Sequence, residues 1–233
     1  MNLVSRPPFA ASAIVARLSS LAALPDTDQA LLRAAESDRR RIAPQREIES
    51  ERRPAGQPLL LLSGWAARVR TFLDGRRQIL SLLLPGDLVG QWHHAGMAAP
   101  ATVIALTEVI LAPAPAAEPG TVLARAYAAA AAQEEAQLYR QIARLGRLSA
   151  YERLADWLLE TRDRLATAGL ANGNGFPMPL TQEVLADMLG LTSVHINRTL
   201  QSMRRDGVLD LRSGTARLSD VQQLASLVDY RAG

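Results

Sequence analysis

Arginine residues gather in one stretch near the carboxyl end of the chain. Residues 193–218 hold five arginines against two aspartates, namely Arg198, Arg204, Arg205, Arg212 and Arg217 against Asp206 and Asp210. A guanidinium group can pair with a phosphate or hold the O6 and N7 atoms of guanine through two parallel hydrogen bonds. This local surplus is what contact with a nucleic acid requires, although a solvated arginine-rich face would have the same composition.

The same stretch has the residue order of two helices joined by a tight turn, over residues 180–211. Ala186 is small enough to let two helices cross closely, and Gly190 can adopt the left-handed conformation of the turn. Ile196 follows six residues later and can anchor the second helix, an order typical of a helix-turn-helix. Further positions fit this prediction: the caps Thr181 and Thr192, the inward Val184, Leu185, Met188, Leu189 and Leu200, and the corner residue Leu191.

The segment after these helices, residues 208–218, predicts a two-stranded wing that turns at Ser213-Gly214, and residues 219–222 predict a capping box that opens a last helix. We call the second helix the reading helix. Arg198 is the expected base-reading residue, Arg212 and Arg217 are expected on phosphates, and His195 could touch DNA or pack inward. The candidate DNA contacts are Thr181, Thr192, Ser193, Val194, His195, Asn197, Arg198, Gln201, Arg204, Arg212 and Arg217.

Upstream elements must hold this unit in place. Residues 12–35 show helical spacing with a break at Pro25. Residues 42–113 are short apolar segments between turns, with residues 59–70 as one strand and a hairpin turn at Asp74-Gly75. Regular turns over this length predict a small antiparallel sandwich or barrel.

A long helix is predicted over residues 122–145, which contain no proline or glycine, with Gly146 ending it. Its apolar positions repeat at about 3.5 residues, which suits pairing with the same helix of a second subunit. Packing on the helix's own domain would give the same periodicity. A capping box at residues 149–152 then predicts another helix over residues 150–166. The candidate dimer contacts are Ala131, Leu138, Ile142 and Leu145.

Composition and missing motifs exclude several classes of function. The chain has no cysteine, which excludes disulfides, thiolate zinc sites, cysteine-ligated iron–sulfur clusters and cysteine nucleophiles. It has no HExxH, GxSxG, P-loop or GxGxxG motif, so we expect no enzyme, no catalytic residue and no cofactor. Arg17 interrupts the apolar stretch at residues 9–24, and no apolar run reaches membrane-spanning length, so we expect a cytoplasmic protein without membrane contact.

Two pairs of adjacent residues, a histidine pair and a glutamate pair, could suggest a functional site but are expected to be structural or surface residues. His93 and His94 are adjacent, and adjacent strand residues point to opposite faces, so they cannot easily share one metal. A structural role is expected for the pair, with a haem or metal sensor as the alternative; no metal site is assigned. Glu134 and Glu135 are expected to be surface charges of the long helix without a buried setting.

The order of these parts resembles the Crp/Fnr family of transcription regulators over nearly the whole chain. The segments that carry the resemblance are SGW, DGRRQILSLLLPGDLVG, LSAYERLADWLL and LTQEVLADMLGLT. It implies an α+β protein with an antiparallel jelly roll of the cyclic-nucleotide-binding type in residues 1–120, a dimerisation helix in residues 121–147 and a winged helix-turn-helix in residues 148–233. It also implies contact with RNA polymerase.

Two departures from the family's pattern concern its ligands. Gly90-Gln91 stands where cyclic-nucleotide-binding members have Gly-Glu, and Ala99-Pro100 stands where they have the Arg-Ser that holds the phosphate. Without that arginine, cAMP and cGMP are not expected, and the effector is unknown. Members commonly have a glutamate where this chain has Val194, so the DNA half-site is expected to differ, with contact to a thymine methyl group becoming possible.

These observations predict a sequence-specific DNA-binding regulator that binds a near-palindromic site as a homodimer. The effector would change the angle between subunits and hence the spacing of the two reading helices. The alternative is a ligand-binding or protein-binding signalling module whose winged helix serves interaction instead of DNA.

Overall fold

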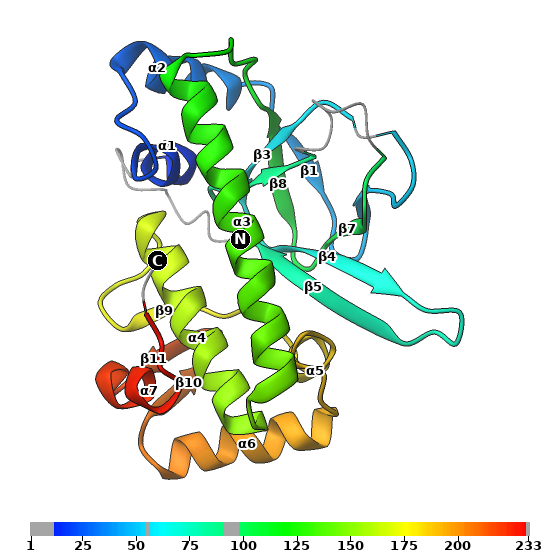
Figure 1. Cartoon of the computed structure of the whole chain (residues 1–233), viewed down its shortest axis with the longest axis vertical. Helices are drawn as coiled ribbons and strands as arrows, with labels where there is room; N and C mark the ends of the chain where they lie inside the picture. The colour runs from blue at the N-terminus through cyan, green and yellow to red at the C-terminus, as the bar shows by residue number, and fades with distance from the viewer. Residues whose placement is uncertain (1–11, 55, 91–97, 232–233) are drawn as a thin grey trace, which may run out of the picture.

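The computed structural model describes residues 12–54, 56–90 and 98–231 (Figure 1). Two short helices come first, followed by eight strands, a long helix and a compact carboxyl-terminal unit. The elements are α1 Ala13–Ser19, α2 Asp26–Ala35, β1 Arg40–Ile42, β2 Glu47–Glu49, β3 Leu59–Ser63, β4 Ala66–Thr71, β5 Arg77–Leu83, β6 Leu88–Val89, β7 Thr102–Ala105, β8 Val109–Pro113, α3 Val122–Arg147, α4 Ala150–Thr167, β9 Gly175–Pro177, α5 Gln182–Leu189, α6 Ser193–Arg205, β10 Leu209–Arg212, β11 Thr215–Leu218 and α7 Val221–Leu227.

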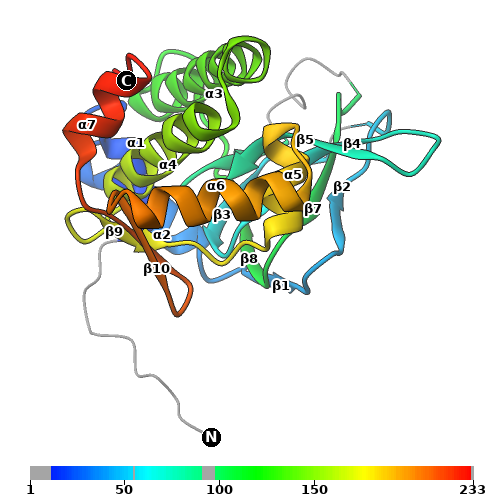
Figure 2. The same ribbon diagram turned by 90° about the horizontal axis from the view of Figure 1, so that it is seen from below.

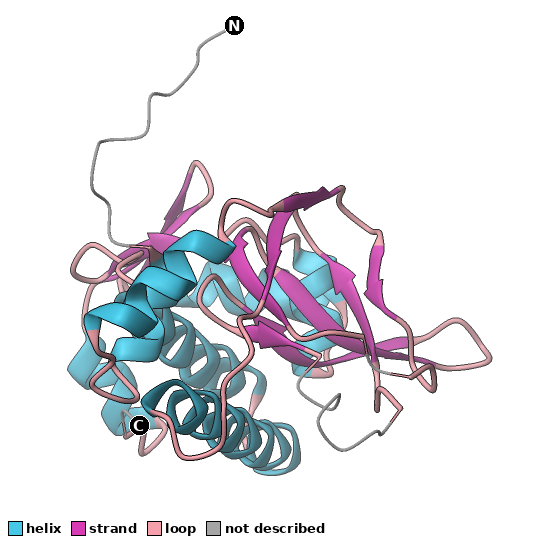
Figure 3. Cartoon of the chain, turned by 90° about the horizontal axis from the view of Figure 1, so that it is seen from above, coloured by secondary structure: helices cyan, strands magenta, loops and turns pink. Residues whose placement is uncertain are grey.

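The first eight strands form the predicted antiparallel jelly roll. One sheet has the order β1-β8-β3-β6 and the other has the order β2-β7-β4-β5. Their facing sides enclose an apolar interior that includes Leu61, Val103 and Leu111, all fully buried. Figure 3 shows most of the helices on one side of the molecule and the jelly-roll strands on the other.

Two turns of this sheet region can be compared with the sequence prediction. The hairpin at Asp74-Gly75 is confirmed, with β4 and β5 paired in antiparallel register on either side of it. The single strand expected over residues 59–70 is wrong, because the chain turns at Gly64 and forms two strands. Gly64 has a φ of 81°, and a β-carbon there would lie 2.1 Å from the carbonyl oxygen of Glu108. Only glycine permits this approach.

The long helix α3 extends two residues beyond its predicted end. It passes through Gly146 and stops at Arg147, where Leu148 takes an extended conformation. A single glycine costs a helix only about 1 kcal/mol, which neighbouring packing easily outweighs. The capping box is confirmed, with Ser149 and Glu152 each bonding the other's backbone, so that α4 begins at once beside α3.

One apolar core joins the jelly roll to the carboxyl-terminal unit. It unites residues of β4 and β5, such as Val69 and Ile79, with residues of α4, α5 and α6, such as Leu158, Met188 and Ile196. Seen from below, α5 lies between the β4–β5 hairpin and α6 (Figure 2). The orientation of the carboxyl-terminal unit is therefore tied to this hairpin.

The wing and last helix complete that unit. Strands β10 and β11 pair around Ser213-Gly214 as predicted, and β11 also pairs with β9. The last helix is capped one residue later than expected, because Asp220 and not Ser219 accepts a hydrogen bond from the backbone of Gln223, at 2.8 Å. Among the described residues, no helix combines the length and the apolar character needed to cross a membrane.

Candidate nucleic-acid interface

The backbone of the helix-turn-helix is fixed by two caps and one glycine. Thr181 accepts a hydrogen bond from the amide of Val184, and Thr192 accepts one from the amide of His195, each at 3.3 Å. Between them Gly190 has a φ of 63°, the left-handed conformation that the sequence required. Underneath α6, Ile196 and Leu200 are buried in the core. These contacts leave one face of α6 free to meet a partner.

The predicted DNA contacts lie on the outward face of α6, at the two helix caps and on the wing. On α6, Val194 is 59% exposed, an unusual position for a β-branched apolar side chain, and it adjoins polar residues on both sides. His195 is exposed, so it does not pack into the core. Every candidate contact is exposed, namely Thr181, Thr192, Ser193, Val194, His195, Asn197, Arg198, Gln201, Arg204, Arg212 and Arg217.

The arginine side chains of α6 and the wing are available for a ligand. In the part of the chain that the structure describes, Arg198, Arg204 and Arg217 form no ion pair. Arg212 pairs with Asp210 at 3.0 Å, but the arginine side chain is 84% exposed, and such surface pairs contribute little. Asp206, at the end of α6, accepts a hydrogen bond from the hydroxyl of Tyr151 at 3.0 Å. Burial and this hydrogen bond raise the pKa of Tyr151 to about 12.

The long helix α3 presents an apolar strip along its outer side. Ile142 is 68% exposed, Ala131 is exposed and Leu138 is half-buried, and a groove of about 800 Å³ runs beside Ala131 and Leu138. Tyr139, which sequence reasoning did not select, is 63% exposed in the same region. Leu145 is half-buried and packs toward the turn at Gly190 of its own chain.

The expectation that Glu134 is a surface charge is wrong. Its side chain is 15% exposed and forms an ion pair with Arg68 of β4, itself 5% exposed. Burial raises the pKa of Glu134. The helix turns this residue toward the jelly roll, whereas Glu135 is exposed and accepts a hydrogen bond from Tyr139. Sequence periodicity could not distinguish these neighbours, because the buried partner comes from a distant strand.

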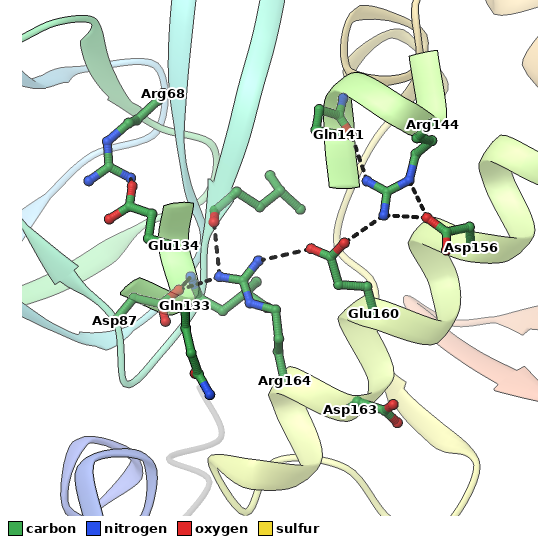
Figure 4. Close-up of polar contacts among 12 residues, drawn as sticks. Arg68, Asp87, Gln133, Glu134, Gln141, Arg144, Asp156, Glu160, Asp163 and Arg164 are labelled. Atoms are coloured by element: carbon green, nitrogen blue, oxygen red, sulfur yellow. Dashed lines mark hydrogen bonds and ion pairs between the residues drawn. The ribbon is translucent and has the colours of Figure 1, made fainter. Parts of the chain in front are cut away.

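A second set of buried charges links the jelly roll and α3 to α4 (Figure 4). Asp87, in the PGD turn before β6, accepts a hydrogen bond from Arg164 at 2.5 Å. Farther along, Arg144 of α3 donates to Asp156 at 2.7 Å and to Glu160 at 2.5 Å. Sequence reasoning missed these groups. The spacing of Asp156, Glu160 and Arg164, four residues apart on one helix face, was the available signal.

The residues that bear on an effector are only partly described. Gly90 has a φ of 79°, and Ala99 is buried at 2% exposure, with no charged side chain to offer a phosphate; Pro100 is exposed. Gln91 and the pair His93 and His94 lie outside the described residues.

Comparison with known proteins matches both halves of the chain. The model of the cyclic nucleotide-binding domain matches residues 39–126, and that of the Crp-like helix-turn-helix domain matches residues 152–227. The chain is 32% identical over 171 residues to the nitrogen fixation regulation protein FixK of Bradyrhizobium diazoefficiens, covering 72% of each protein. It is 32% identical over 160 residues to the transcriptional activator protein FnrL of Cereibacter sphaeroides, covering 65% of this chain and 64% of that protein.

Solved structures give the same result. The structure of FixK2 from Bradyrhizobium japonicum superposes with a TM-score of 0.72 at 27% sequence identity, covering 83% of this chain and 98% of that one. These matches confirm the expected fold, in which an antiparallel jelly roll, a long helix and a winged helix-turn-helix follow one another.

Proposed function

From the premise that this chain belongs to the Crp/Fnr family of transcription regulators, we propose that it binds a near-palindromic DNA site as a homodimer, with α6 of each subunit in a major groove. The family itself makes the chain a sequence-specific DNA-binding regulator and not an enzyme. The proposal for this chain adds which of its residues contact DNA.

The observation that supports DNA contact most strongly is the exposed face of α6. A capped helix whose underside is buried presents Asn197, Arg198 and Gln201 outward, and Arg198 and Arg204 form no ion pair among the described residues. Arg198 projects from the middle of this face, so it reads a base, with guanine as the best partner. Arg212 and Arg217 on the wing contact phosphates, and Val194 offers a methyl contact to thymine.

Dimer formation is proposed along the exposed strip of α3. The apolar residues Ala131, Leu138 and Ile142 lie on one side of the helix, at successive intervals of seven and four residues. This is the spacing at which two parallel helices pack against each other. Pairing of this strip with its counterpart would place the two reading helices about 34 Å apart, one turn of DNA. Leu145 lies at the end of the strip nearest the reading helix, where it is half-buried against the turn at Gly190 of its own chain.

Small-molecule control through cAMP or cGMP is not part of the proposal. The buried Ala99 and the neighbouring Pro100 supply no cation to a cyclic phosphate. RNA polymerase is the proposed protein partner, in keeping with the family, and the cytoplasm is the proposed location.

Binding to fragmented genomic DNA tests the proposal. Purified protein is mixed with fragments, bound DNA is sequenced, and the affinity for the recovered site is measured by gel shift at several salt concentrations. We expect a near-palindromic site and a logarithmic salt slope of about −0.9 per phosphate contact. Absence of an enriched site, together with a flat salt slope, would favour the alternative in which the winged helix binds a protein.

A further inference from the structure

The last turn of α5 is held by side chains from three other elements. The final carbonyl groups of a helix have no partners within the helix. Here the carbonyl of Met188 accepts hydrogen bonds from Nε2 of Gln141 on α3, at 2.7 Å, and from Nε2 of Gln78 on β5, at 3.3 Å. The carbonyl of Leu189 accepts one from Arg153 of α4, at 3.0 Å. These bonds anchor α5 immediately before its turn into α6.

An ion pair adds a second contact between β5 and α5. Arg77 contacts the Oδ2 atom of Asp187 through Nε at 2.8 Å and through Nη2 at 2.6 Å, and both side chains are about one quarter exposed. Adjacent residues of β5, Arg77 and Gln78, thus hold adjacent residues of α5, Asp187 and Met188. A strand of the jelly roll is therefore attached to the helix-turn-helix by both charge and hydrogen bonding.

The amide of Gln141 is fixed in one orientation. Its Oε1 atom accepts a hydrogen bond from Arg144 at 2.5 Å, which leaves Nε2 to donate to Met188. Arg144 is held in turn by Asp156 and Glu160. Gln141 is only 8% exposed, so a buried network in α3 and α4 keeps this donor directed at the end of α5.

We propose that Arg77, Gln78 and Gln141 are positioning residues that set the angle of the reading helix relative to the long helix α3. The inference rests on the proposed function. Because α5 packs against α6 and the two are joined by a short turn, a fixed α5 fixes α6. In a dimer paired along α3, that angle determines the distance between the two reading helices, and so the half-site spacing that the protein accepts.

A loss of positioning differs from a loss of DNA contact. None of the three side chains belongs to the outward face of α6, so their removal leaves each reading helix its own contacts. The affinity for one half-site should persist. What should weaken is the discrimination against sites whose halves are too close or too far apart.

The test compares duplexes that differ in spacing. Fluorescence anisotropy gives the affinity for the recovered palindromic site, for the same site with one base pair added or removed at its centre, and for a single half-site. For the unmodified protein we expect altered spacing to weaken binding by about tenfold, the scale of one lost base contact. In the double variant R77A/Q78A and in Gln141→Glu, which keeps the acceptor for Arg144 but loses the donor, this penalty should shrink to about threefold or less, with half-site affinity within about twofold.

Controls separate positioning from folding. Arg76→Ala removes the adjacent arginine, whose side chain is 81% exposed and pairs with Asp74 instead of α5, and should keep the full spacing penalty. Arg77→Lys, as a single substitution, retains the positive charge opposite Asp187. This variant should keep most of the spacing penalty that R77A/Q78A loses. Should Gln141→Glu not fold, the R77A/Q78A variant decides alone, because its side chains are partly exposed.

Two results would overturn the inference: folded variants with an undiminished spacing penalty, or an unmodified protein that binds all three spacings equally well. A protein that binds none of the duplexes would instead refute the proposed function, so the two failures are distinguishable.

Discussion

Gly190 faces Leu145 of the long helix so closely that a β-carbon on the glycine would lie 3.3 Å from Leu145 Cδ2. The turn of the helix-turn-helix therefore contacts α3 directly. This contact gives Gly190 a second reason to be glycine, besides the left-handed φ of 63°.

Gly190→Ala should lower the stability of the protein through both effects. The left-handed conformation costs a non-glycine residue about 1–2 kcal/mol. Leu145 must also shift by a few tenths of an ångström to admit the new methyl group, which we expect to add to this loss. Gly207 is the matched control, because it has a φ of 72° but nothing lies within 4 Å of the position that its β-carbon would take. In urea unfolding, Gly190→Ala should have a lower free energy of unfolding than Gly207→Ala. Equal losses of stability in the two variants would contradict the contact with Leu145.

Arg198→Ala should relax the choice of base at one position of each half-site. We expect a loss of about 1–3 kcal/mol in binding free energy for the preferred site. Competition with duplexes that carry each of the four base pairs at each position measures both the base preference and the loss of binding free energy. An unchanged preference at every position would show that Arg198 does not read a base.

Arg217→Ala, on the wing, provides the contrast. As a phosphate contact it should weaken binding to all sequences alike and reduce the salt slope by about one unit. A change of base preference in this variant would mean that the wing, and not only α6, reads sequence.

Ile142→Glu should shift the protein from dimer to monomer. A charge in the middle of an apolar helix pairing must be desolvated without a partner. Sedimentation at several protein concentrations checks this, and binding to the full site should fall with it. Leu31→Glu makes the same chemical change at a residue of α2 that is 51% exposed and should leave the dimer intact. A dimeric Ile142→Glu protein would refute pairing along this strip.

The elements of the helix-turn-helix could be predicted from the sequence, because their determinants are local. Thr181, Gly190 and Thr192 act on residues within a few positions of themselves. The burial of Glu134 and the role of Gln141 could not be predicted, since each depends on a partner distant in sequence, Arg68 and Met188. A glutamate on a helix has the same local pattern whether it faces solvent or a strand. The long-range contacts that tie the jelly roll to α5 were missed for this reason.

Glu134 should make stability depend on pH in the sense opposite to that of an ordinary paired carboxylate. Burial raises its pKa above the ordinary value of 4.5, so the folded chain binds this proton more tightly than the unfolded chain. The stability that this tighter proton binding contributes is therefore complete below pH 4.5 and is lost as pH rises through the higher pKa of the folded chain. The unfolding free energy of the unmodified protein minus that of Glu134→Gln should decrease from pH 4.5 to pH 7. An increase over this range would mean that Arg68, and not burial, dominates.

Protection of guanine N7 from methylation on the recovered site tests the central claim, that an arginine-bearing helix of each subunit enters the major groove, because N7 lies in that groove. The account predicts two protected segments related by twofold symmetry, with centres about 10 base pairs apart, both weakened by Arg198→Ala. A single protected segment, or two segments unaffected by that substitution, would contradict it.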